Sequence, residues 1–116
     1  MFVRVLLTGN HEVGSVVSYS AADNAWALAS SVTSPLGIIE EIIQDEETQL
    51  YWGRCAFAGI SYALSNRAIP DQGGELAVLN GSVYVDNATD HAGIIAPLPG
   101  GQETRGAGVL VMVHIR

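Results

Sequence analysis

Apolar residues in this chain are gathered into short runs, and turn-forming residues such as Gly, Asn, Asp and Pro separate one run from the next. The longest uninterrupted runs hold about five or six residues, far below the roughly 20 that a membrane-spanning helix needs. Short runs bounded by turn residues are typical of β-strands. We therefore expect an all-β fold, either a small β-barrel or a tulip-like sandwich. The predicted strands are residues 2–7, 14–19, 26–29, 36–43, 48–64, 75–79, 82–85, 92–98 and 109–115.

One segment fits two interpretations. Residues 38–47 place their isoleucines where a helical stripe would also put them. Gly37 and the β-branched side chains favour a strand instead. The acidic stretch Asp45–Glu47 that follows predicts a solvent-exposed hairpin loop.

Glycines mark the expected bends. In the long strand predicted over 48–64, Gly53 and Gly59 indicate bulges or corners. Asn80-Gly81 lies between two apolar runs, which is the strongest short signal for a tight β-hairpin.

Two stretches of the chain echo each other. Residues 14–39 read as strand, turn, strand, polar spacer and a strand that contains Gly-Ile-Ile, and residues 74–95 read the same way. This echo predicts one β domain, residues 1–116, built from two meander-like halves.

Period-2 alternation predicts which side chains face the core, although a slip of one residue would turn a whole strand over. The side chains expected to be mainly buried are Trp26, Leu28, Ile38, Phe57, Ile60, Val83, Val85, Ile94, Val111 and Val113.

Charge limits the possible partners. The chain carries 12 acidic and 5 basic residues, a formal net charge of −7 at pH 7. Because binding to phosphates needs clustered cations, we expect no nucleic-acid partner. No basic segment precedes an apolar one near the start, so we expect no secretory signal and no membrane partner. The single cysteine excludes an internal disulfide.

There is no lysine, and the five basic residues are Arg4, Arg54, Arg67, Arg105 and Arg116. This excludes Schiff-base and P-loop lysine chemistry. Arginine is planar and always charged, which suits fixed ion pairs at an interface. A biased genome composition explains the missing lysine equally well.

No motif for catalysis stands out. His11, His91 and His114 lack a metal-ligand spacing. Cys55 follows Arg54, but neighbours in a strand face opposite ways, so a buried structural cysteine is the favoured interpretation.

Two groups of side-chain oxygens resemble calcium ligands. The first group lacks a glycine-punctuated ligand loop, and a solvated edge that discourages sheet pairing is its simpler role. We expect no enzyme activity, no cofactor and no metal. The two groups are Glu40, Glu41, Asp45, Glu46 and Glu47, and Asp86, Asn87 and Asp90.

Element order then suggests a family. The chain runs Val16-Val17, a turn, Trp26-Ala-Leu-Ala, a Ser/Thr-rich spacer, Leu36-Gly37-Ile38-Ile39, an acidic loop, and Thr48-x-Leu50-x-x-Gly53-Arg54 before an aromatic. This pattern resembles the small head decoration, or cement, proteins of tailed bacteriophages, the lambda-type decoration proteins among them. The later stretches 80–85 and 92–95 resemble the repeated small barrels of several phage head proteins.

The resemblance implies a non-enzymatic virion protein, made in the host cytoplasm, that lies as a homotrimer on the outer capsid surface and bridges subunits of the major capsid protein. In that family an N-terminal arm commonly adds a strand to a capsid sheet. Here a strand begins at Phe2, so we expect the strand itself to be the docking edge, with Arg4 as its outward cation. The apolar strand expected over 109–115 is the other one that could offer an edge for added pairing. The expected contacts with capsid or with other protomers are Phe2, Val3, Arg4, Val5, Arg54 and Arg67.

Other functions stay open. A head-fibre or tail-fibre attachment domain would share the barrel and the trimer. A carbohydrate-binding module would use an aromatic platform, although a domain with eight aromatic residues needs most of them for its core. A small enzyme has no residues that we can name. The candidate platform residues are Trp26, Tyr51, Trp52 and Tyr84.

Overall fold

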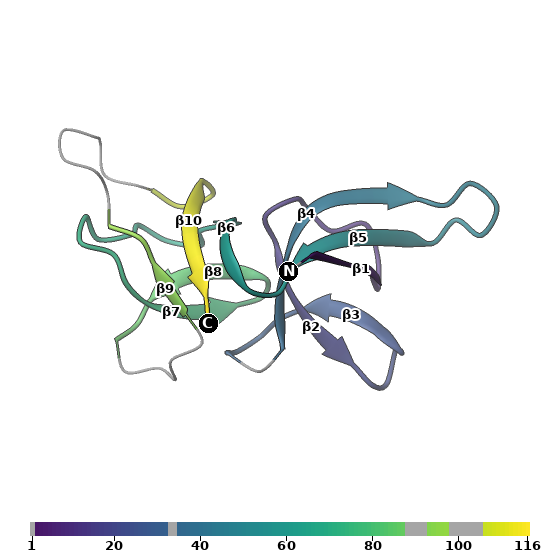
Figure 1. Ribbon diagram of the computed structural model, residues 1–116, viewed down its shortest axis with the longest axis horizontal. Helices are drawn as coiled ribbons and strands as arrows, with labels where there is room; N and C mark the ends of the chain where they lie inside the picture. Colours follow the sequence, from purple (N-terminus) through teal and green to yellow (C-terminus); the bar gives the residue numbers. More distant parts are fainter. Residues whose placement is uncertain (1, 33–34, 88–92, 98–105) are drawn as a thin grey trace.

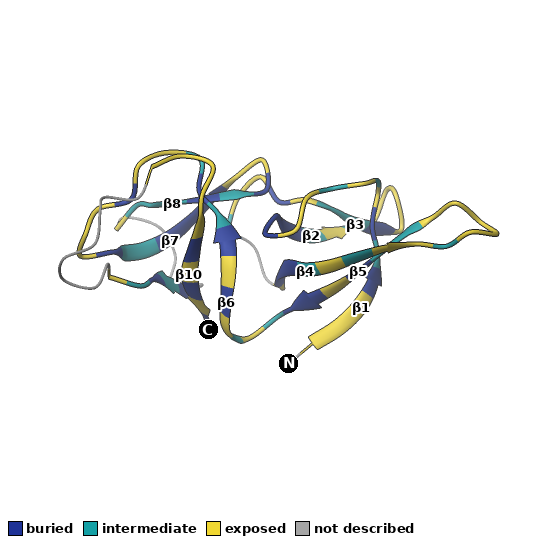
Figure 2. Ribbon diagram, turned by 90° about the horizontal axis from the view of Figure 1, so that it is seen from above, coloured by how far each residue is buried: buried dark blue, intermediate teal, exposed yellow. Residues whose placement is uncertain are grey.

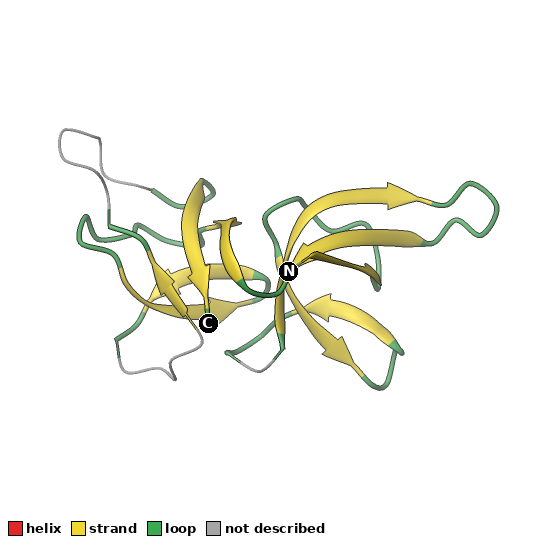
Figure 3. Ribbon diagram, in the orientation of Figure 1, coloured by secondary structure: helices red, strands yellow, loops and turns green. Residues whose placement is uncertain are grey.

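The computed structural model describes residues 2–32, 35–87, 93–97 and 106–116. These residues form strands and no helix, which confirms the all-β prediction (Figure 3). No helix able to cross a membrane occurs in the described part of the chain. The strands are β1 (Phe2–Leu6), β2 (Val16–Ser20), β3 (Ala25–Leu28), β4 (Leu36–Gln44), β5 (Tyr51–Ala56), β6 (Gly59–Leu64), β7 (Gly74–Leu79), β8 (Ser82–Val85), β9 (Gly93–Ile95) and β10 (Leu110–Ile115).

The strands make two five-stranded antiparallel sheets that pack together. The first has the order β1-β5-β4-β2-β3 and the second β6-β10-β9-β7-β8. The sheets lie side by side, so the molecule is elongated, 48 × 26 × 23 Å (Figure 1). Neither sheet closes into a barrel: among the described residues the outer strands meet at the single parallel bridges Leu7↔Trp26 and Ser65↔Val83.

The two sheets repeat one topology. Adding five to each strand number of the first order gives the second order. The pairing register repeats as well: adding 58 to both residues of the pair Phe2↔Ala56 gives Ile60↔His114, which is also a pair. The predicted echo of 14–39 and 74–95 is therefore part of a larger repeat, and we call residues 2–56 the first half and 59–115 the second half.

The single strand predicted over 48–64 is wrong. β5 ends at Ala56, and β6 begins at Gly59 in the other sheet. Gly59 has a φ of 84°, a conformation that glycine adopts readily, and this lets the chain cross between the sheets. Gly53 makes no bend; it leaves room for Leu7, whose Cδ1 atom would lie 3.0 Å from an added Cβ. The register irregularity lies instead in β4, between Ile39 and Glu41.

The shorter turn predictions are confirmed. Asn80 and Gly81 both have positive φ values, 50° and 81°, and join β7 to β8 as a tight hairpin. Residues 36–44 form a strand rather than a helix. In the acidic loop that follows, the Oδ1 atom of Asp45 accepts a hydrogen bond from the Glu47 backbone N–H at 2.8 Å.

The larger core cluster is shared by both halves. The second half supplies most of its buried side chains, and the first half adds Val16, Ala29, Leu36 and Ile38. The five buried residues of the smaller cluster all belong to the first half. This cluster consists of Val5, Leu7, Val17, Ile39 and Cys55, with Trp26, Ile42, Tyr51 and Phe57 packed against it.

Two of the side chains predicted to be buried are exposed, Leu28 at 40% and Ile60 at 62%. Leu28 lies over Gly81 rather than in the core. In β6 the inward positions belong to Ser61 and Ala63, so the expected register was off by one residue. Ile38, Val83, Val111 and Val113 are buried as predicted, and Trp26, Phe57, Val85 and Ile94 are half-buried.

Backbone contacts join the halves. The Gly81 N–H donates to the Ala29 carbonyl and the Val16 N–H donates to the Gly81 carbonyl, both at 2.7 Å. A Cβ on Gly14 would lie 2.6 Å from Leu110 Cδ2. The β7–β8 turn and the loop before β2 thus lock the two halves together.

Candidate functional site

The first strand is unusually exposed. Phe2 is 50% and Val3 41% accessible, and Arg4 is exposed beside them (Figure 2). β1 lies at the edge of its sheet and pairs along its length only with β5. Val5, by contrast, is buried in the smaller core, so it supports the strand from beneath.

The outer face of β1, β5 and β4 carries two arginines. Residues directly opposite in antiparallel strands share a face. Arg4 lies opposite Arg54, and Arg54 lies opposite Glu41. The Arg54 guanidinium carbon lies 4.6 Å from the centre of the Phe2 ring, a cation–π contact. We call Phe2, Arg4, Trp52 and Arg54 the arginine face.

A hollow of about 410 Å³ opens on this face, lined by Arg4, Ile43, Asp45 and Trp52. Arg4 makes no ion pair or ring contact within the described residues. Since like charges directly opposite one another are unfavourable, a carboxylate that approached Arg4 and Arg54 would be stabilised.

The other described arginines are engaged within the second half. The Arg67 guanidinium carbon lies 3.9 Å from the centre of the Tyr84 ring, and its Nε donates to Asn66 at 3.0 Å. Arg116 lies 3.8 Å from Glu75. Of the predicted contact residues, Phe2, Arg4 and Arg54 therefore come together, Val3 points to the opposite face, and Arg67 lies elsewhere.

The equivalent outer face in the second half is apolar. There Tyr62 lies opposite Met112, and Leu64 lies opposite Leu110. Ile60, Tyr62 and Leu110 are each more than half exposed. A groove of about 390 Å³ runs beside them, and Val13 forms part of its wall. We call Val13, Ile60, Tyr62, Leu110 and Met112 the apolar face.

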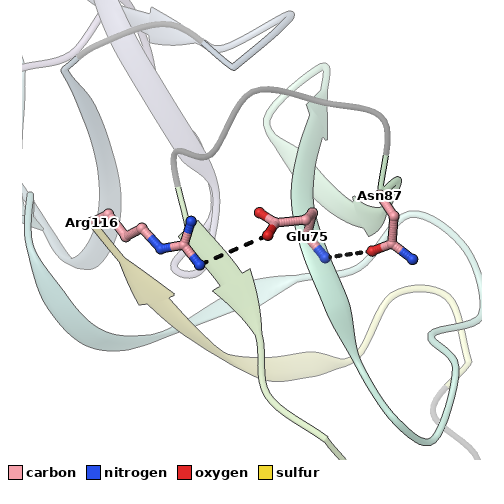
Figure 4. A network of polar contacts seen from close by, with 3 residues as sticks. All are labelled: Glu75, Asn87 and Arg116. Atoms are coloured by element: carbon pink, nitrogen blue, oxygen red, sulfur yellow. Dashed lines mark hydrogen bonds and ion pairs between the residues drawn. The ribbon is translucent and has the colours of Figure 1, made fainter.

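Charged groups border the apolar face on two sides. Toward β4, the Oε2 atom of Glu40 accepts a hydrogen bond of 2.7 Å from Ser61 Oγ. Toward β7, Arg116 pairs with Glu75, whose backbone N–H donates to Asn87 Oδ1 at 2.9 Å (Figure 4). These polar groups already have partners within the chain.

Cys55 is fully buried, as predicted. Burial raises the pKa of its thiol to about 12, and the nearby Glu40 carboxylate adds to the effect. The thiol therefore stays protonated at neutral pH, which disfavours a role as a nucleophile.

Metal ligands do not gather in the described residues, where no group of three His, Cys, Asp or Glu side chains could hold an ion. His91 and Asp90 lie outside those residues. Asn87 and Asp45, members of the two oxygen groups, accept backbone hydrogen bonds.

The predicted aromatic platform is not assembled. Trp26 packs edge-on against Phe57, with ring centres 5.0 Å apart, and Tyr51 joins the smaller core. Tyr84 lies under Arg67. Trp52 is the member of the set that lines the hollow.

Sequence reasoning did not locate the apolar face, and its expectation of a free edge at 109–115 is wrong, because β10 lies inside its sheet between β6 and β9. Residues 110–113 of β10 are apolar on both sides, with Leu110 and Met112 outside and Val111 and Val113 inside. A strand that is apolar on both faces was the available signal, because a solvated sheet normally alternates apolar with polar residues.

Comparison with known proteins finds no match to this chain among family models, curated proteins or solved structures.

Proposed function

We propose that this protein decorates the head of a tailed bacteriophage, binding the outer surface of the capsid through its arginine face and bridging neighbouring capsid subunits. The element order resembles that of head decoration proteins. The observation that carries the proposal is the pairing of Arg4 with Arg54 beside the exposed aromatic Phe2.

The chemistry of this face suits a protein partner that offers carboxylates. Arginine binds carboxylates through two parallel hydrogen bonds, and arginine and aromatic residues dominate the binding energy of protein interfaces. The hollow beside Trp52 can receive a partner side chain. Because the whole chain carries −7, attraction to an acidic capsid surface must be local and sensitive to salt.

The backbone of β1 offers a second means of attachment. Its outer edge is unpaired along Phe2–Leu6 among the described residues, and an extended capsid segment can add to such an edge as a further strand. Edge pairing would align the capsid segment beside Arg4. This keeps the strand, rather than a separate arm, as the docking element.

Binding to isolated capsid shells that lack the protein tests the proposal. Arg4→Glu and Arg54→Glu should each weaken binding by at least about tenfold, since truncated hot-spot residues cost 2 kcal/mol or more. Arg67→Glu is the matched control, with the same charge change in the second half. Wild-type affinity in both face variants would refute the arginine face, and a wild-type protein that binds no shell would refute the capsid role.

A glycan-binding module is the second candidate, because Trp52, Asp45 and Arg4 line one hollow. An aromatic ring beside polar groups is a common way to hold a sugar. Saturable binding of a glycan, lost in Trp52→Ala, in a protein that ignores capsid shells would favour this function over decoration.

A further inference from the structure

We infer that the apolar face of β6 and β10 is the surface through which copies of this chain bind one another. Four of its side chains project from the two strands, and Val13 adds a fifth from the loop before β2. The exposed fractions of Ile60, Tyr62 and Leu110 are 62%, 52% and 53%. The inference does not depend on the capsid role.

The exposed area is near what a specific contact needs. Large side chains present on the order of 150–250 Å² each, so five that are about half exposed offer roughly 400–500 Å². Two such faces placed together would cover about 800–1,000 Å², close to the lower limit for a specific interface. Apolar patches of this size on a monomer commonly mark a binding site.

The distribution of charge makes this face the place where a second copy can pack. Copies of a chain that carries −7 repel one another, so they can pack closely only where no carboxylate projects. The outward positions of β6 and β10 hold Ile60, Tyr62, Leu64, Leu110, Met112 and His114, and none is acidic. The carboxylate that lines the groove, Glu40 of β4, lies at its border and accepts a hydrogen bond from Ser61. The equivalent positions of the first half hold Arg4 and Arg54, which suit an acidic partner instead.

The charged groups at the borders of the apolar face also fit a second copy as the partner. Glu40 is bonded to Ser61, and Glu75 is paired with Arg116 (Figure 4). Arg116 offsets the charge of Glu75, and Glu40 stays at the border with a hydrogen bond from Ser61, so another uncharged face can cover the surface between them. The same face on another copy meets that requirement, either paired across a two-fold axis or gathered with two others around a three-fold axis.

Sedimentation equilibrium of the full chain tests the inference. Wild type should sediment as two or three chains at micromolar concentration. Tyr62→Glu and Met112→Glu should each raise the dissociation constant by at least about 100-fold, because each places a carboxylate in the contact. Tyr19→Glu is the matched control, because Tyr19 is also an exposed tyrosine on a strand, 50% accessible, but lies in the first half. This variant should associate as strongly as wild type.

Circular dichroism confirms that each variant is folded before its mass is measured. A wild-type protein that stays monomeric at every concentration overturns the inference, and so does wild-type association in both face variants. The assay contains no capsid, so its outcome is separate from the shell-binding result. Arg4→Glu should lose its affinity for capsid shells and keep the oligomeric mass of wild type.

Discussion

The two halves of this molecule share strand order, and β1–β5 and β6–β10 share a register, but the halves differ in how they fill their interiors. The first half closes its own small core, with the aromatic side chains Trp26 and Phe57 packed against it. The second half forms most of a larger, aliphatic core, to which the first half contributes Val16 and Ile38 among others. One topology can therefore be stabilised in two ways, and the second half depends on the first.

The outer faces differ as well. The pair Arg4↔Arg54 in the first half corresponds to Tyr62↔Met112 in the second. Exposed positions have little influence on the fold, so the same sheet can present a surface that bears arginines or an apolar one. The difference indicates two partners: an acidic protein surface for one half and another copy for the other.

The largest expected effect comes from the side chain that joins the halves. Ile38→Ala should lower the free energy of unfolding by about 2–5 kcal/mol, because Ile38 is 1% exposed and lies in the shared core. Ile43→Ala on the same strand is the control, since Ile43 is 47% exposed and should change stability by less than about 0.5 kcal/mol.

Urea denaturation monitored by tryptophan fluorescence and circular dichroism measures both effects. The two signals should follow one transition in both variants, since the halves share a core. Two separate transitions in wild type, or a loss below about 1 kcal/mol in Ile38→Ala, would show that the halves fold independently.

The equivalent glycines of the two Gly-Ile-Ile strands sharpen the comparison. A Cβ on Gly93 would collide with the backbone carbonyl of His114, whereas a Cβ on Gly37 would lie 2.8 Å from the Phe57 ring, which can shift. Gly93→Ala should therefore cost about 2–3 kcal/mol of stability and Gly37→Ala about 1 kcal/mol. Thermal denaturation compares them with Gly9→Ala, where nothing lies within 4 Å. The reverse ranking would contradict the close strand packing at Gly93.

The last comparison depends on pH, and close to pH 9 its effect is small. Cys55 corresponds to Val113 in the repeat, and its pKa is raised from 9.0 to about 12 in the folded protein. The unfolded thiol therefore loses its proton first as pH rises. Stability should then fall by about 1.4 kcal/mol per pH unit from pH 9 toward pH 12.

Cys55→Val introduces the residue found at the equivalent position of the second half, Val113. This variant should lose the part of the pH dependence that comes from the thiol and keep the parts that come from all other groups. Urea denaturation at pH 8, 9 and 10 measures it. An equal slope in wild type and Cys55→Val would mean that the buried thiol does not couple to folding.

Local features of the fold were predictable from sequence because they depend on neighbouring residues. Asn80-Gly81 specified its hairpin, and the isoleucines of 36–44 formed a strand as expected. The outward direction of Arg4 followed from alternation along β1. The crossing between the sheets at Gly59 was harder to predict, because a glycine marks a bend but does not indicate which sheet the next strand joins.

The candidate faces depend on pairing between distant segments. Arg4 and Arg54 were both expected at an interface, but only the β1–β5 register places them opposite each other. A strand that is apolar on both sides, such as residues 110–113 of β10, signals an additional contact surface, but hydropathy does not say which of its positions face outward.

The central claim is that the two equivalent faces serve different partners. Its most direct test measures capsid-shell binding and oligomeric mass together for Arg4→Glu and Tyr62→Glu. The account predicts that Arg4→Glu loses shell affinity by at least about tenfold and keeps its mass, while Tyr62→Glu becomes monomeric and each monomer still has an intact arginine face. The account is contradicted if Arg4→Glu becomes monomeric and still binds shells like wild type. It is also contradicted if Tyr62→Glu loses shell binding and keeps the oligomeric mass of wild type.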